Sequence, residues 1–435
     1  LRASVGRCCP DGWGFHLSAL SAYVSVTAAY WALMLTDGAL RMLVLLHFHT
    51  LGFTPVQLAY LFLLYEVAGM VTNLFAGWIA ARVGMTSTLY AGLGLQVAAL
   101  LALACLDPGW AIAVSVAYVM LVQGVSGVAK DLAKMSSKSA VKILAPETQG
   151  GLFRWVAVLT GSKNAIKGVG FLLGAVLLGL FGFTTTVLAM AAVLAVILAA
   201  ILTAMPSSLP AGRKGVKISE VFSKSANVNW LSAARVFLFG ARDVWFVVGI
   251  PIYFYAVLSD GTEASNRTAF FAIGTFMAGW IILYGAVQAL APRLLRAATV
   301  SERVLVGRAQ VWAWVLSAIP AFLTLAILLM PAQAVGTTVT LVAGLLVFGA
   351  VFAVNSSLHS YLILAFSRTE RVTMDVGFYY MANAGGRLLG TALSGLSYQV
   401  GGLPLMFGTA TAMVALSALA ASRLSAPDLS ASAKT

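Results

Sequence analysis

Long apolar stretches separated by short polar connections recur along the whole chain. Each is about 20 residues long, the length that an α-helix needs to cross the roughly 30 Å hydrocarbon core of a bilayer. A helix also satisfies its backbone hydrogen bonds internally, as a lipid-embedded segment must. The pattern therefore predicts an all-α membrane protein with twelve transmembrane helices, near residues 22–48, 55–81, 86–106, 110–134, 152–181, 184–205, 230–258, 269–291, 309–330, 337–366, 374–399 and 403–422.

The composition supports this fold class. Hydrophobic residues make up 60% of the chain and charged residues only 9%, and the mean hydropathy is +0.94. Soluble domains carry about 25% charged residues. The net charge of +13 is spread over many connections and forms no single basic stripe. We therefore expect the lipid bilayer as a partner and no nucleic acid.

One long polar connection divides the pattern into two halves. It runs from Pro206 to Asn229 and leaves six predicted helices on each side. The first methionine is Met34, and the residues before 21 lack the clean apolar region of a signal peptide. The predicted organisation is a cytoplasmic tail of doubtful authenticity at 1–20, a six-helix bundle at 21–205, a cytoplasmic central loop at 206–229, a second six-helix bundle at 230–424 and a cytoplasmic tail at 425–435.

The distribution of lysine and arginine predicts the orientation of the chain. These residues concentrate in the tails, the central loop and every second connection, whereas the connections of the other side hold Arg267 alone. Cytoplasmic loops carry the excess of positive charge in membrane proteins. Both termini are therefore expected to be cytoplasmic.

Short motifs repeat between the halves. GSKNAIKG at Gly161–Gly168 is similar to NAGGRLLG at Asn383–Gly390, and each places an Asn-Ala pair before a buried cation. Asp37–Arg41 in the first predicted helix corresponds to Gly240–Asp243 in the seventh. Two parallel halves of six spans, with a substrate site near the midplane, describe the major facilitator fold. Chance similarity among apolar helices is the alternative.

Four cations lie deep inside predicted spans. A charge at that depth costs about 2.5–3.5 kcal/mol, so it requires a function or a partner. Lys163 and Lys167 are spaced i,i+4 and share one helix face. These lysines either bind a substrate anion or form a structural ion pair with Glu66 or Asp37. The predicted substrate-binding residues are Lys163, Lys167, Arg242, Arg387, Asn164 and Asn383.

Acidic residues at the same depth are predicted to act in gating or coupling. Asp37 and Arg41 are spaced i,i+4 and can pair within one helix. Arg242 and Asp243 are adjacent and point in different directions, which predicts that they do not pair and that Asp243 neutralises a neighbour such as Arg387. The mid-depth cations outnumber the anions, a surplus that suits a multiply charged anion. The predicted gating or coupling residues are Asp37, Arg41, Glu66 and Asp243.

Two further charged features each allow two interpretations. Glu66 can titrate and couple proton movement to the substrate, or it can be the permanent partner of Lys163 or Lys167. The segment Lys130–Lys142 continues the fourth helix into the cytoplasm. Its cations lie against anionic lipid or draw an anionic substrate towards the entrance.

Other classes of function lack their sequence signals. An enzyme would need a nucleophile and a base, or metal ligands, at one membrane face, and the sequence offers neither; its four histidines are scattered. No nucleotide-binding loop is present, so direct drive by ATP is not expected. We therefore expect no enzymatic activity, no cofactor and no metal, and a secondary transporter for a small anion.

Four strings are rich in charge within apolar segments. They are TDGALRMLVLLHFHTLGFTP (Thr36–Pro55), KDLAKMSSKSAVK (Lys130–Lys142), GSKNAIKG (Gly161–Gly168) and NAGGRLLGTALSG (Asn383–Gly395). These strings resemble the ArsJ family of organoarsenical efflux permeases, which belongs to the major facilitator superfamily. The resemblance runs from about Ser21 to Leu424.

This resemblance implies a multi-pass permease of the bacterial inner membrane that gives arsenate resistance. It implies export of 1-arseno-3-phosphoglycerate, which glyceraldehyde-3-phosphate dehydrogenase makes when arsenate replaces phosphate, and hence a functional link to that enzyme. The charges alone also fit uptake or exchange of a sugar phosphate or another organic anion. The superfamily's loop pattern Gly-x-x-x-Asp-Arg-x-Gly is kept only in part, with Ala81 in place of the aspartate and matches at Gly77, Arg82 and Gly84.

Overall fold

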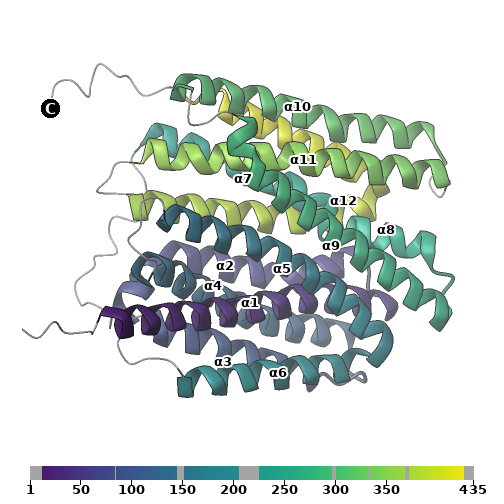
Figure 1. The fold of residues 1–435 in the computed structure, drawn as a ribbon. Helices are drawn as coiled ribbons and strands as arrows, with labels where there is room; N and C mark the ends of the chain where they lie inside the picture. Colours follow the sequence, from purple (N-terminus) through teal and green to yellow (C-terminus); the bar gives the residue numbers. More distant parts are fainter. Residues whose placement is uncertain are drawn as a thin grey trace, which may run out of the picture.

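The computed structural model describes residues 12–83, 85–144, 151–204, 225–295, 300–331, 334–367 and 372–425. Every regular element in these ranges is an α-helix, and most helices run roughly parallel to one another (Figure 1). Their bounds are α1 Gly12–Thr50, α2 Pro55–Val83, α3 Met85–Ala104, α4 Ile112–Leu144, α5 Gly151–Phe181, α6 Phe183–Ala204, α7 Ala226–Phe246, α8 Gly249–Leu258, α9 Glu263–Leu294, α10 Glu302–Leu329, α11 Val335–Phe366 and α12 Val372–Ala421.

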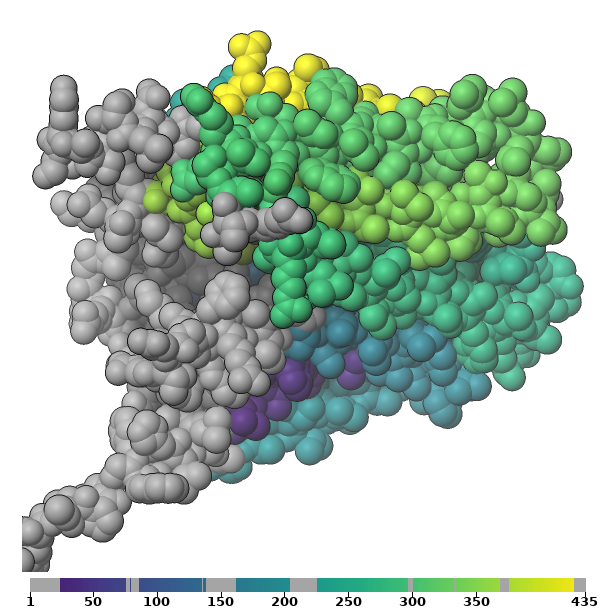
Figure 2. Space-filling view, turned by 45° about the horizontal axis from the view of Figure 1, so that its top comes forward, coloured from purple at the N-terminus to yellow at the C-terminus, as the bar shows by residue number. Residues whose placement is uncertain are grey.

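The helices pack as a first set, α1 to α6, and a second set, α7 to α12. In the first set α1 packs against α5 and α4, and α3 packs against α4 and α6. In the second set α12 packs against α7 and α10, and α11 packs against α9 and α10. The sets meet where α2 lies against α12 and α5 against α9. Figure 2 shows the second set, coloured green to yellow, above the first set, coloured purple to teal.

Among the described residues, eleven helical segments are long and apolar enough to cross a membrane. The surface agrees with this, because large aliphatic side chains are exposed on α6 at Val193 and Val196, and on α10 at Leu325, Leu328 and Leu329. Exposed apolar surface on this scale is unfavourable in water and suits contact with lipid tails. The predicted class of all-α membrane protein is confirmed.

The longest helix, α12, contains a sharp kink. The backbone is non-helical at Gly401 (φ −141°, ψ 18°) and at Gly402 (φ 59°, ψ −150°), and Pro404 follows two residues later. The positive φ of Gly402 favours a residue without a Cβ. The kink lies in the gap between the predicted helices 374–399 and 403–422.

The predicted helix 230–258 is interrupted in the structure, which has α7 and α8 in its place. Pro251 has no backbone N–H, so it cannot donate a hydrogen bond to the carbonyl oxygen one turn earlier. This missing bond weakens the helix at this point. The N–H groups of Val248 and Gly249 donate to the hydroxyl oxygen of Ser394 on α12, at 3.2 and 3.3 Å. The break depends on this distant serine, so the local pattern did not reveal it.

Close contacts at glycines bring together the two helix pairs that carry the central charges. A Cβ on Gly170 of α5 would lie 2.5 Å from the Leu35 carbonyl oxygen and 3.2 Å from the Cα of Gly38, both on α1. A Cβ on Gly390 of α12 would overlap the Gly240 carbonyl oxygen of α7. Small residues allow membrane helices to approach this closely. The pair α1–α5 in the first set therefore corresponds to α7–α12 in the second.

Some predicted boundaries differ from the structure. The first helix begins at Gly12, earlier than the predicted residue 22. Helix α7 begins inside the predicted central loop, because the Ser225 side chain caps it by accepting from the N–H of Val228 at 3.4 Å. Most of the predicted tails and of the central loop lies outside the described residues, as do the side chains of the loop pattern at Gly77, Ala81, Arg82 and Gly84.

Candidate functional site

In the first set, donors surround the carboxylate of Asp37 on α1. Its Oδ2 lies 3.1 Å from Nζ of Lys167 on α5, and its Oδ1 accepts a 2.5 Å hydrogen bond from the hydroxyl of Tyr65 on α2. The close approach of the two helices at Gly38 and Gly170 places Lys167 beside the carboxylate. The structural ion pair that the sequence offered as an alternative for Lys167 is therefore present.

The second set holds an equivalent pair. Nε of Arg387 on α12 lies 3.4 Å from Oδ2 of Asp243 on α7, a contact that is electrostatic because neither atom makes a hydrogen bond. Nη2 and Nε of Arg242 lie 2.5 and 2.6 Å from Oδ1 of the same aspartate. The prediction that Arg242 and Asp243 do not pair is wrong. The long arginine side chain folds back over Phe239, whose ring centroid is 4.9 Å from the guanidinium carbon.

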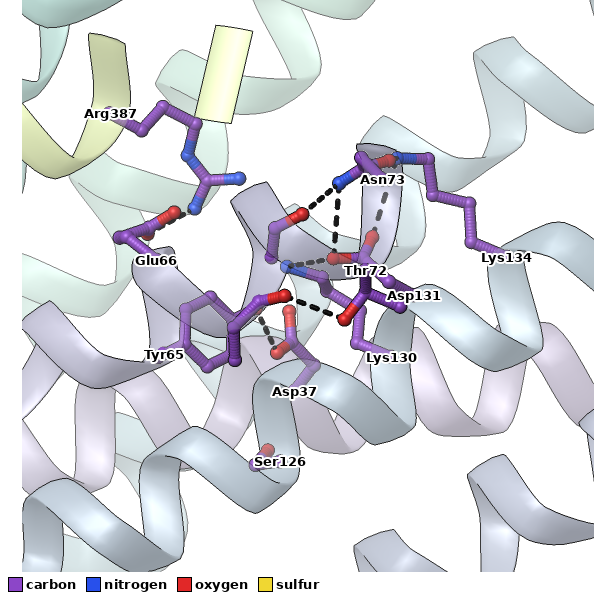
Figure 3. A network of polar contacts seen from close by, with 12 residues as sticks. Asp37, Tyr65, Glu66, Thr72, Asn73, Ser126, Lys130, Asp131, Lys134 and Arg387 are labelled. Atoms are coloured by element: carbon purple, nitrogen blue, oxygen red, sulfur yellow. Dashed lines mark hydrogen bonds and ion pairs between the residues drawn. The ribbon is translucent and has the colours of Figure 1, made fainter. Parts of the chain in front are cut away.

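Glu66 of α2 connects the two sets. Its Oε1 lies 2.6 Å from Nη2 of Arg41 on α1 and 2.5 Å from Nη2 of Arg387. Figure 3 shows Arg387 extending from α12 towards this carboxylate, which is 1% exposed. Arg41 thus pairs across a helix interface and not, as predicted, with Asp37 on its own helix. Glu66 therefore has two arginine partners in the structure, whereas the sequence offered Lys163 or Lys167 as its partner.

The central charges are paired but not balanced. Arg41, Arg242 and Arg387 share the two carboxylates of Glu66 and Asp243. Three guanidinium groups against two carboxylates leave one surplus positive charge in this cluster. Each of the three arginines therefore has an acidic partner, as a charge removed from water needs an opposite charge nearby. A positive surplus remains for the cluster as a whole.

A further charged cluster lies on α2 and α4 (Figure 3). Asp131 accepts from the amide of Asn73 at 3.2 Å and pairs with Lys134 and Lys130 at 3.4 and 3.7 Å. Lys134 also donates to the amide oxygen of Asn73 at 2.8 Å. Lys130 and Asp131 are buried, so this part of the segment Lys130–Lys142 packs inside the protein and does not lie against lipid headgroups.

Sequence reasoning did not select Arg235 of α7, which is 5% exposed. Its Nε donates to Oδ1 of Asn383 on α12 at 3.0 Å, and its Nη1 donates to the carbonyl and hydroxyl oxygens of Ser356 on α11 at 3.2 and 3.1 Å. The guanidinium carbon lies 3.9 Å from the ring centroid of Phe239 and 4.9 Å from that of Tyr379. The available signal was an arginine in an apolar helix with no acidic residue one turn away.

The two predicted asparagines belong to the surroundings of Arg235. Asn164 of α5 donates to the Gln288 amide oxygen on α9 at 3.2 Å, and the Gln288 amide nitrogen lies 3.5 Å from the Ser356 hydroxyl. Polar contacts therefore lead from Asn164 in the first set through Gln288 and Ser356 to Arg235. Arg235 in turn contacts Asn383. Lys163, next to Asn164, is half-buried.

The arrangement suits electrostatic binding of an anion. Arginine offers a fork of donors that matches the oxygens of carboxylate, phosphate or arsenate, and lysine acts as a point charge. Within the described ranges, no group of three or more His, Cys, Asp and Glu side chains is placed to hold a metal ion. Charged and polar groups of α1, α2, α5, α7 and α12 converge on the contact between the sets.

Comparison with known proteins shows the fold. No family model matches the chain, and no curated protein matches it. The crystal structure of a POT family transporter in complex with 5-aminolevulinic acid matches with a TM-score of 0.71 and 14% identity, over 91% of this chain and 94% of that one. A mutant of the nucleoside transporter NupG matches with a TM-score of 0.66 and 15% identity, over 93% and 98%. The chain thus shares the overall fold of these two membrane transporters.

Proposed function

We propose that this chain is a secondary transporter for a small, multiply charged organic anion. The observation that carries the proposal is Arg387, which contacts Asp243 in its own set and Glu66 in the other. An anion that bound Arg387 would compete with both carboxylates and weaken the contact between the sets. Because a ligand shifts a conformational equilibrium by its difference in affinity for the two states, this competition would favour movement of one set against the other.

Two bundles of six spans fit this mechanism. In the proposed topology, the arms of α12 on either side of Gly401 and Gly402 cross the membrane separately, and α7 with α8 crosses once. The kink supports this assignment. In Figure 1 the start of α1 and the end of α12 both lie at the left of the molecule. This placement agrees with both termini being on the same side of the membrane. The lysine and arginine distribution assigns that side to the cytoplasm.

The proposed substrate is 1-arseno-3-phosphoglycerate, exported across the bacterial inner membrane, so that the chain gives arsenate resistance together with glyceraldehyde-3-phosphate dehydrogenase. The resemblance of the four charged strings to the ArsJ family supports this substrate, and so does the positive surplus of the central cluster. Phosphate and arsenate groups carry several negative charges, which forked arginine donors bind well. In this scheme the anion site is Lys163, Lys167, Arg242 and Arg387, and the gating residues are Asp37, Arg41, Glu66 and Asp243.

Inverted membrane vesicles provide the direct test, because export from the cell becomes uptake into the vesicle. The dehydrogenase product formed with arsenate is offered beside arsenate alone and stable phosphate esters. We expect arsenic to accumulate only with the dehydrogenase product. Preferential uptake of a sugar phosphate would point to the alternative substrate, and failure to take up any anion would contradict the proposed transporter.

Alanine variants test the anion site in cells. Arg387→Ala or Lys167→Ala is expected to abolish arsenate resistance at normal membrane abundance, because each removes a central cation. The matched control is Arg267→Ala, whose arginine is 47% exposed and, within the described ranges, forms an ion pair with Glu263 one turn away. Full resistance in either central variant would remove that residue from the site.

A further inference from the structure

Arg235 is a buried cation with no acidic partner among the residues that the structure describes. In the described part of the chain no carboxylate is ion-paired with it, and its three hydrogen bonds go to neutral oxygens of Asn383 and Ser356. Its Nη2 makes no hydrogen bond there. An unpaired charge inside a membrane protein is costly, so such residues commonly mark a substrate pathway. Arg235 thus has both the charge and an open donor for an anion.

His359 of α11 is fully buried and follows by three residues Ser356, to which Arg235 donates, so both residues are on the same turn of the helix that Arg235 contacts. Among the described residues, neither of its ring nitrogens has a hydrogen-bond partner. Buried polar groups nearly always have a hydrogen-bond partner, so a buried imidazole without one, one turn from a serine that Arg235 contacts, calls for an explanation. An oxyanion between the two side chains would accept from both and would satisfy them together.

The second arginine cluster is close enough for one small solute to contact both. Arg235, Phe239 and Arg242 follow one face of α7, since they are spaced by four and three residues. The Phe239 ring centroid lies 3.9 Å from one guanidinium carbon and 4.9 Å from the other, which puts these carbons at most about 9 Å apart, the sum of the two distances. Asn383 and Arg387 continue the same arrangement on α12, one turn apart.

We propose that Arg235 and His359 form a second anion subsite, which takes a phosphate- or carboxylate-type oxyanion at one end of a solute whose other end binds Arg242 and Arg387. This inference rests on the proposed function, because both subsites hold one transported solute. It narrows the substrate class to short molecules with an oxyanion at each end. Asn164 and Gln288 extend the subsite to the first set, so a bound solute would be contacted from both sets.

Two stable probes separate the subsites. They are 3-phosphoglycerate, with an oxyanion at each end, and glycerol 3-phosphate, with one. Binding of each to the full chain in lipid nanodiscs is measured by calorimetry. Wild type is expected to bind 3-phosphoglycerate at least about tenfold more tightly, as one charged hydrogen-bonded contact predicts. Arg235→Gln should remove this preference and change glycerol 3-phosphate binding by less than about threefold, whereas Arg267→Gln should change neither.

The outcomes distinguish the two proposals. Equal wild-type affinity for the two probes, or an equal loss for both in Arg235→Gln, would overturn the second subsite and leave the transporter proposal intact. A wild type that binds neither probe would overturn the subsite and argue against the proposed anion carrier as well.

A second variant covers the case in which Arg235→Gln does not fold. His359→Leu removes an imidazole that has no hydrogen-bond partner in the described part of the chain, so the melting temperature should stay the same or rise. The preference for 3-phosphoglycerate should fall by about threefold or more. A lower melting temperature with an unchanged preference would identify a structural histidine and refute the subsite.

Discussion

The two sets of helices hold the same kind of ion pair in different ways. In the first set Lys167 of α5 pairs with Asp37 of α1, and in the second Arg387 of α12 lies against Asp243 of α7. Each cation precedes by three residues the glycine at which the helices touch. The repeat therefore extends from sequence to packing. Among the contacts of the described residues, Arg387 of the second set also pairs with Glu66 of the first, whereas Lys167 pairs within its own set.

The chemistry of the two cations explains the difference. A lysine ammonium is a point charge, whereas an arginine guanidinium presents a planar fork of donors that serves two acceptors at once. Nη2 of Arg387 donates a hydrogen bond to Glu66 of the other set, while its Nε lies 3.4 Å from Asp243 of its own set in a purely electrostatic contact. The similar helix pairs thus differ in function: Lys167 forms an ion pair within the first set, whereas Arg387 also connects the second set to the first.

The largest effect is expected when the Glu66 carboxylate, which connects the two sets, is removed. Glu66→Gln leaves Arg41 and Arg387 without a shared carboxylate, and stranding buried charges costs about 3–5 kcal/mol. The melting temperature of the purified protein in nanodiscs should fall clearly. The control Glu263→Gln, in an exposed ion pair, should cost less than about 1 kcal/mol. Similar melting temperatures for the two variants would show that the bridge does not hold the sets together.

The local pair should tolerate the equivalent change better. Asp37→Asn strands Lys167, and a buried lysine can lose its proton whereas an arginine cannot. We expect a loss of roughly 2–3 kcal/mol, smaller than for Glu66→Gln, in the same melting measurement. A larger loss for Asp37→Asn would reverse the proposed ranking of the two pairs.

The glycine contacts test whether both sets depend on the same packing. Gly170→Ala and Gly390→Ala each force a Cβ into a neighbouring backbone, and such overpacking costs about 1–3 kcal/mol. Gly279→Ala, where nothing lies within 4 Å, should be neutral or slightly stabilising. Thermal unfolding of the three variants decides the question; a tolerated alanine at either contact would restrict the close packing to one set.

The smallest expected effect concerns the loops after the first span of each set. Thr54 and Gln57 exchange neutral hydrogen bonds before α2. Before α9, the Ser265 hydroxyl and then the N–H and hydroxyl of Thr262 donate to Asp260 and lower its pKa to about 2. These bonds stabilise the loop above the ordinary carboxyl pKa of about 4 and are lost as the pH falls through about 2. Ser265→Ala should raise this pKa in a carboxyl NMR titration; an unchanged value would exclude Ser265 as its cause.

Much of the fold was predictable because it depends on local composition. The apolar windows located the helices, and the gap before residue 403 matched the kink at Gly401 and Gly402. The break after α7 was missed because Ser394, far along the chain, replaces the lost helical bonds. For the site, the sequence identified the deep charges but paired Arg41 wrongly and passed over Arg235. Partner choice depends on which faces of different helices meet.

The sequence by itself determined that the chain lies in a membrane, where its helices run and which charges are buried. These properties follow from transfer free energy and hydrogen bonding within single segments. Only the tertiary structure decided that Glu66 is shared by two arginines, that Arg242 folds back onto Asp243, and that Arg235 has no acidic partner among the described residues. Coulomb energy depends on distance, and side chains from remote helices come within a few ångströms only after packing.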